Sequence, residues 1–277
     1  MDSCQQLIDR IQETLRELHI PAWLLYGFHD RDPIALRILQ FKADQLATRR
    51  WFYLIPAQGE PQKLVHRIEA AMLDHLPGNK EVYLQWEKLQ NGLKGLLKGV
   101  PTVAMQFSEN NAIPYFSHVD AGTVDLVRSC NTEVVSSGDL LQHFEAVLSS
   151  QQLSGHRATA LALTSIVQAA FKEAATTVAA NGATNEWSIQ RFILDRFKEA
   201  GLETEHAPIV AVNENSADPH YQPTEQKFSG IKLGDFLLID LWARSREPES
   251  TYSDITWNAY LGPEVPDRIQ EVFQAVH

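Results

Sequence analysis

The sequence predicts an α/β domain up to about residue 150, followed by part of an α+β domain. Three observations support this fold class. Short apolar runs alternate with helical patterns in the first half of the chain, which is typical of an α/β sheet. Near residue 150 the pattern changes to two long helices followed by strands. The length of 277 residues is enough for two domains, each with its own core.

The first helix is indicated by an amphipathic pattern near the N-terminus. Ser3 and Gln6 form a capping-box pair, and Leu7, Ile11 and Leu15 recur at helical spacing. Strands and helices then alternate. The apolar runs predict strands at 22–27, 51–56, 81–85, 102–107 and 133–137, and the helical patterns lie at 64–76, 86–98 and 118–129. This alternation predicts helices on both faces of a sheet.

The second half begins with an Ala-rich helical stretch from Ser154 to Ala180, which Asn181 and Gly182 terminate. A second helix is predicted at about 185–200, and strands at 207–212, 235–244 and 251–260. We place the domain boundary at about residue 150, with the stretch 149–152 as the joint, so the domains are 1–150 and 151–277.

The last residues predict a helix that begins at Pro266 and has an apolar face of Ile269, Val272, Phe273 and Val276. This apolar face continues to His277 with no capping residue. The pattern favours a fragment that stops within a domain, and the alternative is a frayed natural terminus.

The charge and cysteine content exclude several classes of protein. The net charge of −11 and the absence of a basic stripe argue against nucleic acid as a partner. Two cysteines, Cys4 and Cys130, are too few for a disulfide framework or a thiolate zinc site. The sequence has no signal peptide and no run of about 20 apolar residues, so we expect a cytoplasmic protein without a membrane span.

Two carboxylates within predicted strands are the central candidates for chemistry. Asp240 lies in DFLLIDLWAR, where an ionised group costs free energy to desolvate, and Asp254 lies in TYSDITWNAY. A hairpin with its turn centred near Glu247 would place Asp240 and Asp254 directly opposite each other on one face, with Cβ atoms about 4.5–5.5 Å apart.

Two carboxylates at that distance repel each other unless one is protonated or cations lie between them. Hard divalent ions prefer oxygen ligands, so the pair predicts a site for two metal ions. The alternative is that each aspartate is an edge or bulge residue that faces water.

His220 is a third candidate because it lies in a loop, NSADPHYQPT, just before the two carboxylate strands. An imidazole there could donate a hydrogen bond to a developing oxyanion, whereas a lone loop histidine is more often only solvated. We interpret His156 and His206 as structural or surface residues. The chain contains neither an HExxH zinc helix nor a GxSxG nucleophile elbow.

The segments NSADPHYQPT, IKLGDFLLIDLWAR and YSDITWNAY resemble the creatinase/aminopeptidase (peptidase M24) superfamily with the pita-bread fold, and in particular its Xaa-Pro aminopeptidase-like members. TRRWFYLIPAQGEPQKLVHRIE and AIPYFSHVDAG resemble the creatinase-like N-terminal domain of bacterial members. The resemblance covers essentially the whole chain.

The resemblance implies that Asp240 ligates one metal, that Asp254 bridges two, and that His220 contacts the substrate. It implies two divalent ions, usually manganese, a peptide substrate with proline in second position, and a homodimer. The remaining ligands of the superfamily, one His and two Glu, find no match, so the resemblance implies a C-terminally truncated and inactive fragment of a metalloaminopeptidase. Two alternatives stay open: a non-catalytic peptide-binding module of the same fold, and a metal-free hydrolase of the creatinase kind.

Overall fold

The computed structural model describes residues 4–42 and 47–276. The chain divides between Val147 and Leu148 into two compact units. Each unit is described by itself below. Within the described residues, no helix is both long enough and apolar enough to cross a membrane.

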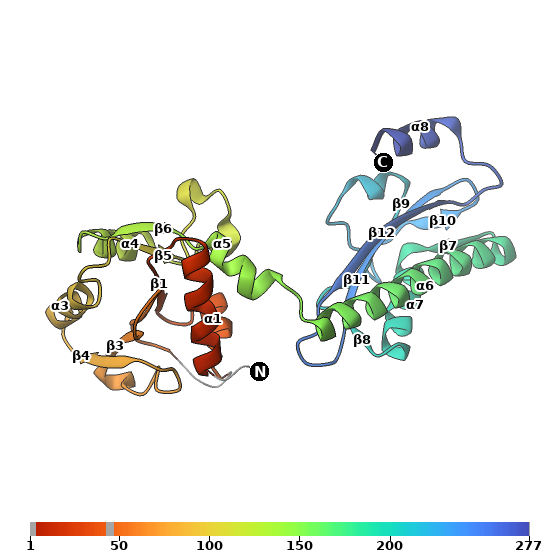
Figure 1. The fold of residues 1–277 in the computed structure, drawn as a ribbon. Coiled ribbons are helices and arrows are strands. Elements are labelled where there is room, and N and C mark those ends of the chain that lie inside the picture. Colours follow the sequence, from red (N-terminus) through yellow and green to blue (C-terminus); the bar gives the residue numbers. More distant parts are fainter. Residues whose placement is uncertain (1–3, 43–46, 277) are drawn as a thin grey trace. The chain divides into compact units, whose positions relative to one another are not determined.

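The first unit is built on a six-stranded sheet with the strand order β4-β3-β2-β1-β5-β6 (Figure 1). β1 pairs with β2 and β2 with β3 in antiparallel fashion, and the other pairs are parallel. The central strand β1 is buried along its whole length, which explains its continuous apolar sequence. The strands are β1 (Ala22–Gly27), β2 (Trp51–Pro56), β3 (Gln62–His66), β4 (Asn79–Tyr83), β5 (Thr102–Met105) and β6 (Glu133–Ser136).

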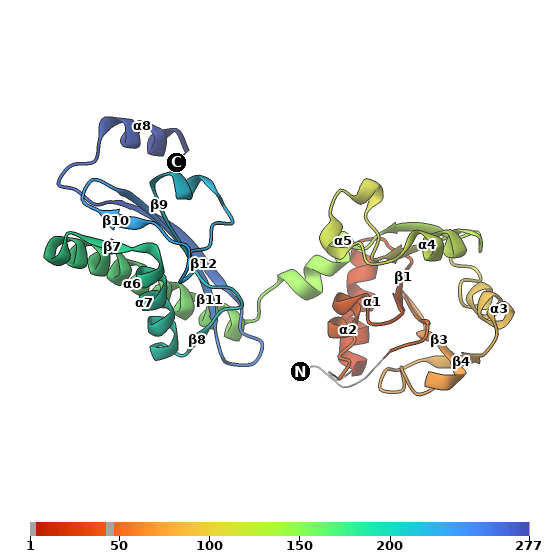
Figure 2. The same cartoon turned by 180° about the vertical axis from the view of Figure 1, so that it is seen from behind.

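Helices cover both faces of this sheet, as the sequence predicts. Trp23 and Leu25 of β1 share a core with α1 (Cys4–Glu17), α2 (Pro33–Ile38) and α5 (Gly138–Leu141). The first two of these helices lie on the same side of β1 in Figure 2. Leu24 and Tyr26 point to the opposite face, where α3 (Trp86–Leu96) and α4 (Ala121–Arg128) pack. The short helices of this unit are η1 (Arg67–Glu69), η2 (Glu109–Asn111), η3 (Pro114–Phe116) and η4 (Gln142–Ala146).

The predicted helix at 64–76 is wrong. Gln62–His66 form β3, and only Arg67–Glu69 are helical, as a single 3-10 turn. Leu64 and Val65 are both fully buried because they point to opposite faces of a sheet that is covered on both sides. The predicted strand at 81–85 lies two residues earlier, at β4. Of the predicted capping box, Ser3 lies outside the described residues.

The second unit begins with α6 (Ser150–Asn181), which is 32 residues long. The stretch 149–152, which we predicted to be a joint, instead starts this helix. Ser149 and Gln152 form a reciprocal capping box. The helix ends as predicted at Gly182, which has a φ of 83°. It is followed by α7 (Glu186–Glu199).

A twisted sheet packs against α6 and α7 (Figure 1). β11 is its central strand, with β12 along one side and β8 and β9 along the other, and β7 pairs with β10 in a separate ribbon. Leu237, Ile239 and Leu241 of β11 point into the helical core, so the residues between them lie on the opposite face. The remaining elements are β7 (Ala183–Asn185), β8 (Leu202–Glu203), β9 (Ile209–Val212), η5 (Asn213–Ala217), β10 (Gly230–Lys232), β11 (Phe236–Ser245), β12 (Ser253–Tyr260) and α8 (Asp267–Val276).

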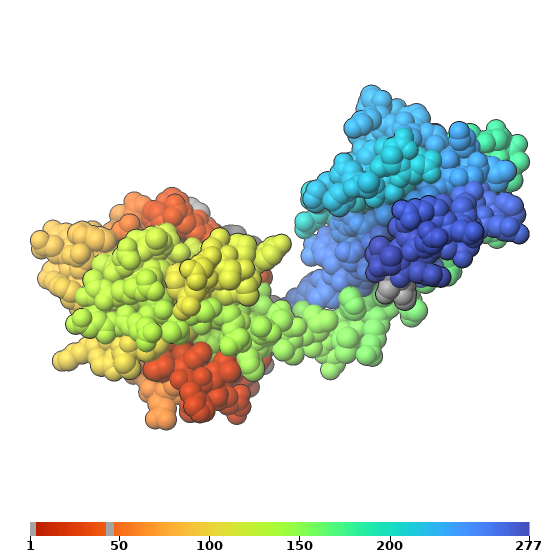
Figure 3. All heavy atoms as spheres, turned by 90° about the horizontal axis from the view of Figure 1, so that it is seen from above, coloured from red at the N-terminus to blue at the C-terminus, as the bar shows by residue number. Residues whose placement is uncertain are grey.

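The last helix, α8, has no buried residue. Its side chains form part of the surface of the second unit in Figure 3. Pro266 precedes this helix, at the position where the sequence predicts its start.

Candidate metal centre

Asp240 and Asp254 lie on the same face of the antiparallel β11–β12 pair, but they are not directly opposite each other. Asp240 is opposite Thr256, and Asp254 is opposite Trp242. The turn is therefore centred one residue further along than we predicted, at Pro248 instead of Glu247. The two aspartates are diagonal neighbours, whose Cα atoms are typically about 7–8 Å apart.

The open face of the sheet explains how two carboxylates can occupy these strands. Asp240 is half-buried and Asp254 is exposed, because both point away from the core that packs on α6 and α7. The cost of desolvation is therefore smaller than the apolar neighbours in the sequence suggest. Thr256 Oγ1 donates a hydrogen bond to Asp240 Oδ1 and orients that carboxylate.

The electrostatics of the pair would favour a bound cation. Partial burial, and secondly the negative charge of Asp240, raise the pKa of Asp254 above its ordinary value. Each cause disfavours the ionised form of Asp254, and a bound cation would compensate for both.

His220 lies in the same cleft as the two aspartates. A cleft of about 650 Å³ is lined by His206, Ala207, Ile209, Pro219, His220, Gln222, Asp240, Trp242 and Asp254. These residues come from β11, β12, the loop before β9, the first residue of β9 and the loop that follows η5. The structure thus brings together the three residues that the sequence singles out.

The backbone around His220 is held by an Asx-type turn. Its N–H donates to Asp218 Oδ1 at 2.9 Å, and the N–H of Tyr221 donates to the carbonyl oxygen of Asp218 at 3.1 Å. The imidazole itself is exposed, so it can approach a molecule bound in the cleft.

His206 also lines the cleft, which our interpretation of it as a structural or surface residue did not anticipate. The adjoining backbone is tied to the His220 loop, because Gln222 Nε2 donates to the carbonyl oxygen of Ala207 at 3.0 Å. Gln190, which is buried, donates to the carbonyl oxygen of Pro208 at 2.7 Å. His206 and His220 are 14 positions apart in a region with no regular spacing, so no sequence pattern links them.

His156 has a structural role, as predicted, and this role bears on the site. Its Nδ1 lies 2.9 Å from the carbonyl oxygen of Tyr252 and 3.0 Å from Ser253 Oγ. Ser253 Oγ donates to the carbonyl oxygen of His156 at 2.8 Å. These contacts fasten the start of β12, next to Asp254, to α6.

The donor set fits a divalent cation in type but is incomplete in number. Carboxylate oxygens are suitable ligands for hard divalent ions, and two aspartates on one face can share such ions. Over residues 4–42 and 47–276, however, no group of three or more His, Cys, Asp or Glu side chains is arranged to hold a metal. Asp240 and Asp254 would therefore need further ligands to hold such an ion.

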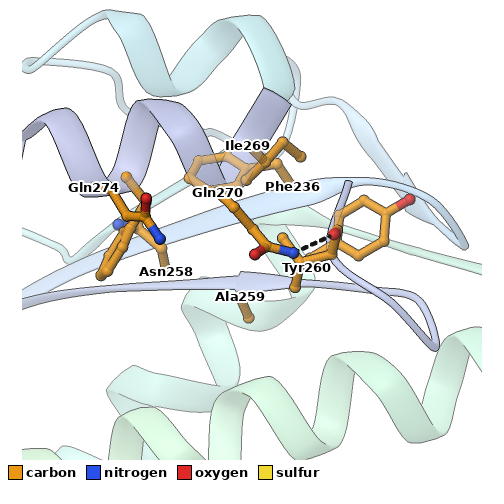
Figure 4. Close-up of a pocket in the computed structure, with 9 residues that line it drawn as sticks. Phe236, Asn258, Ala259, Tyr260, Ile269, Gln270 and Gln274 are labelled. Carbon is orange, nitrogen blue, oxygen red and sulfur yellow. Dashed lines mark hydrogen bonds between the residues drawn. The ribbon is translucent and has the colours of Figure 1, made fainter. Parts of the chain in front are cut away.

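A second groove, of about 280 Å³, lies between α8 and the far end of the β11–β12 ribbon (Figure 4). It is lined by Phe236, Asn258, Ala259, Tyr260, Val265, Ile269, Gln270, Phe273 and Gln274. Gln270 Nε2 donates to the carbonyl oxygen of Val265 at 2.8 Å. No acidic or imidazole side chain lines this groove, so it offers no carboxylate or imidazole ligand to a metal ion.

Most of the second unit matches a known protein family. Residues 159–277, which include both aspartates and His220, match the model of metallopeptidase family M24. No curated protein matches the chain in sequence.

Solved structures of peptidases have a similar fold over nearly the whole chain. Dipeptidase PepE from Mycobacterium ulcerans matches with a TM-score of 0.62 and 15% identity, over 97% of this chain and 67% of its own. A prolidase from Thermococcus sibiricus matches with a TM-score of 0.59 and 16% identity, over 100% and 70%. X-prolyl aminopeptidase from Caenorhabditis elegans, a cytosolic enzyme with a di-nuclear active site, matches with a TM-score of 0.60 and 14% identity, over 96% and 42%. At these identities the likeness shows the fold.

Proposed function

Since the chain has the creatinase/M24 fold of Xaa-Pro peptidases and its residues 159–277 match the M24 metallopeptidase model, we propose that it is part of a metal-dependent aminopeptidase. The reaction is release of the N-terminal residue from peptides with proline in second position. Asp240 and Asp254 are two of the metal ligands, and His220 is the residue that contacts the substrate.

The observation that carries this proposal is the placement of Asp240, Asp254 and His220 in one cleft. Asp240 and Asp254 follow His220 in the sequence by 20 and 34 positions, and the fold brings all three to this cleft. No other described pocket combines a pair of carboxylates with a histidine.

In this proposal the two aspartates bind the divalent metal ions. Both carboxylates lie on one face of the β11–β12 pair and would offer oxygen ligands to divalent ions in the cleft. Two divalent ions, if bound there, would supply Lewis acidity toward the peptide carbonyl and would lower the pKa of a water molecule. Thr256 keeps Asp240 oriented through its hydrogen bond.

His220 acts on the scissile peptide group. Its exposed imidazole donates a hydrogen bond to the carbonyl oxygen, and this bond strengthens as negative charge develops on that oxygen. The turn at Asp218 holds the backbone of His220, so only the side-chain torsions remain to be fixed when substrate binds.

The two aspartates do not complete a metal site, because no third His, Cys, Asp or Glu among the described residues is placed to join them as a ligand. We therefore assign no general base to this chain. Catalysis belongs to the complete protein, and the 277 residues alone are inactive. Manganese is the metal that we propose.

We further propose the identity of the two domains, the cellular compartment and the oligomeric state. Residues 1–150 are a creatinase-like N-terminal domain, and residues 151–277 are the first half of a pita-bread domain. We propose that the enzyme is a cytoplasmic homodimer. Cys4 and Cys130, which are both free thiols, suit a reducing compartment.

The test is peptide hydrolysis by the natural protein. With Mn²⁺ present, it should release the first residue from an Xaa-Pro-Xaa tripeptide, and a chelator should abolish this activity. The matched substrate has alanine in place of proline and should be cleaved more slowly. Activity that survives exhaustive chelation would exclude a metal-dependent mechanism.

The alternative is a non-catalytic peptide-binding module, which the incomplete ligand set favours. This alternative predicts that the natural protein binds Xaa-Pro peptides without cleaving them, and that Mn²⁺ does not change the affinity. A metal-free hydrolase of the creatinase kind would cleave its substrate in the presence of chelator. Asp240 and Asp254 would then not act as metal ligands.

A further inference from the structure

We propose that Glu186 is a positioning residue, which fixes the loop that carries His220 over the cleft. Its effect reaches His220 through the neighbouring residue, Tyr221. The proposal rests on the proposed function only for what His220 does to a substrate. The positioning itself follows from contacts within the second unit.

Glu186 is fully buried, at the first residue of α7, and accepts four hydrogen bonds. Its Oε1 accepts from the N–H of Val212 at 2.8 Å and from Asn215 Nδ2 at 2.9 Å. Its Oε2 accepts from the hydroxyl of Tyr221 and from the N–H of Ser229, both at 2.6 Å. Four donors thus satisfy the oxygen atoms of this buried carboxyl group.

The four donors are distributed along one segment, residues 212–229. Val212 ends β9 and Ser229 precedes β10, so the carboxylate joins the two ends of the loop as well as two points inside it. The described regular structure of this segment consists of η5 and one isolated bridge, between Thr224 and Lys227. Glu186 therefore supplies the hydrogen bonds that a sheet or helix would otherwise provide.

Tyr221 transmits this constraint to the cleft. It is buried, and its ring lies in a small cluster with Ile209 and Ala211, against which Trp242 packs. Burial, together with the hydrogen bond to Glu186, raises the pKa of Tyr221, so its hydroxyl remains a donor at neutral pH. With the ring and the hydroxyl both fixed, the backbone of the adjacent His220 is fixed as well.

Glu186 is not a catalytic residue, because it does not line the cleft. Gln222 also ties the loop to Gln190 of α7 and to the carbonyl oxygen of Ala207. The side chain of Glu186 differs in that it bonds to both ends of the loop as well as to Tyr221, the neighbour of His220.

The test is Tyr221→Phe in the natural protein, which removes one hydroxyl and keeps the ring in its cluster. The matched control is Tyr53→Phe in the first unit, which also removes a buried tyrosine hydroxyl, one that donates to the carbonyl oxygen of Pro77. The two readouts are hydrogen exchange at amides of the loop 213–229 and the NMR signal of the His220 imidazole, assigned with His220→Gln.

In Tyr221→Phe we expect exchange at the amides of residue 221 and Ser229 to rise about tenfold or more, because the hydrogen bond from the residue-221 side chain to Glu186 is lost. The His220 signal should shift or broaden. Tyr53→Phe should change neither readout. Peptide hydrolysis should show a fall in kcat that exceeds any rise in KM.

Unchanged exchange and an unchanged His220 signal in Tyr221→Phe would overturn the proposal, whether or not the protein cleaves peptides. A wild-type protein without peptidase activity would refute the proposed function. The exchange measurement would then still test whether Glu186 and Tyr221 position the loop. Glu186→Gln places an NH₂ group against two of the four donors and should loosen the loop further. If this variant does not fold, the exchange and NMR measurements on Tyr221→Phe still test the proposal.

Discussion

Asp254 is the diagonal neighbour of Asp240 across the β11–β12 ladder, two residues from the position directly opposite. Both side chains remain on the open face of the sheet, because side-chain direction alternates with a period of two. The diagonal arrangement separates the two charges more than a direct pairing does. It thereby reduces their repulsion and leaves space for cations between them.

Loss of either aspartate should abolish tight metal binding. We expect Asp240→Asn and Asp254→Asn each to weaken Mn²⁺ binding by more than about tenfold, because even a group that only orients a ligand contributes about 10–100-fold. Isothermal titration calorimetry of the natural protein measures this. Asp125→Asn, an exposed acid on α4 in the first unit, is the control for loss of one charge. Equal Mn²⁺ affinity in all three variants would remove the cleft from consideration as a metal site.

His220→Gln separates substrate activation from metal binding. The variant should bind Mn²⁺ as the wild type does, because His220 is not a ligand in our proposal. We expect kcat for an Xaa-Pro peptide to fall about 10²–10³-fold, the usual effect of removing one donor to a developing oxyanion. Steady-state kinetics measures the loss. A change in metal affinity without a change in kcat would make His220 a ligand instead.

The strands of the site were predictable, but their register was not. The apolar run of DFLLIDLWAR and the alternation of TYSDITWNAY correctly place Asp240 and Asp254 on one face. The loop RSREPES permits a turn centred at Glu247 or at Pro248. A shift of the centre by one residue moves the pairing by two, so the face is preserved while the partner of Asp240 changes from Asp254 to Thr256.

Other features depend on contacts that no local pattern encodes. His206 reaches the cleft because Gln190 and Gln222 hold the adjoining backbone, and these residues come from two different segments. The strand β3 was mistaken for a helix because Leu64 and Val65 are both buried in a sheet that is covered on both faces. A pattern with adjacent buried residues has no period of two.

His156 should stabilise the second unit through its contacts with β12. In His156→Ala the carbonyl oxygen of Tyr252 loses its imidazole partner, and the hydroxyl of Ser253 keeps only its bond to the backbone carbonyl oxygen of residue 156. We expect the free energy of unfolding to fall by about 1–3 kcal/mol. His143→Ala, an exposed histidine of η4, should change it by less than about 0.5 kcal/mol. Urea unfolding measures both, and equal values for the two variants would show that the contacts of His156 contribute nothing.

Asp32 should make the protein less stable as the pH rises. Burial raises the pKa of Asp32 from 3.8 to about 6, and the hydrogen bond from the N–H of Ala35 and the charge of His118 reduce this rise. Only 3% of Asp32 is exposed, and among the described residues its Oδ2 has no hydrogen-bond partner. Below about pH 4 the carboxyl is protonated in both the folded and the unfolded chain, and it has no pH-dependent effect.

Between pH 4 and pH 6 the folded chain retains a proton that the unfolded chain releases, so the free energy of unfolding falls as the pH rises through this range. A shift of this size corresponds to about 3 kcal/mol once both forms are ionised. Asp32→Asn removes the charge, and its side-chain oxygen can still accept from the N–H of Ala35 at the start of α2. We expect the variant to equal the wild type at pH 4 and to exceed it by up to about 3 kcal/mol at pH 8. Urea titrations at both pH values measure this difference, and a variant less stable than the wild type at pH 8 would show that the charged form of Asp32 is stabilised in the fold.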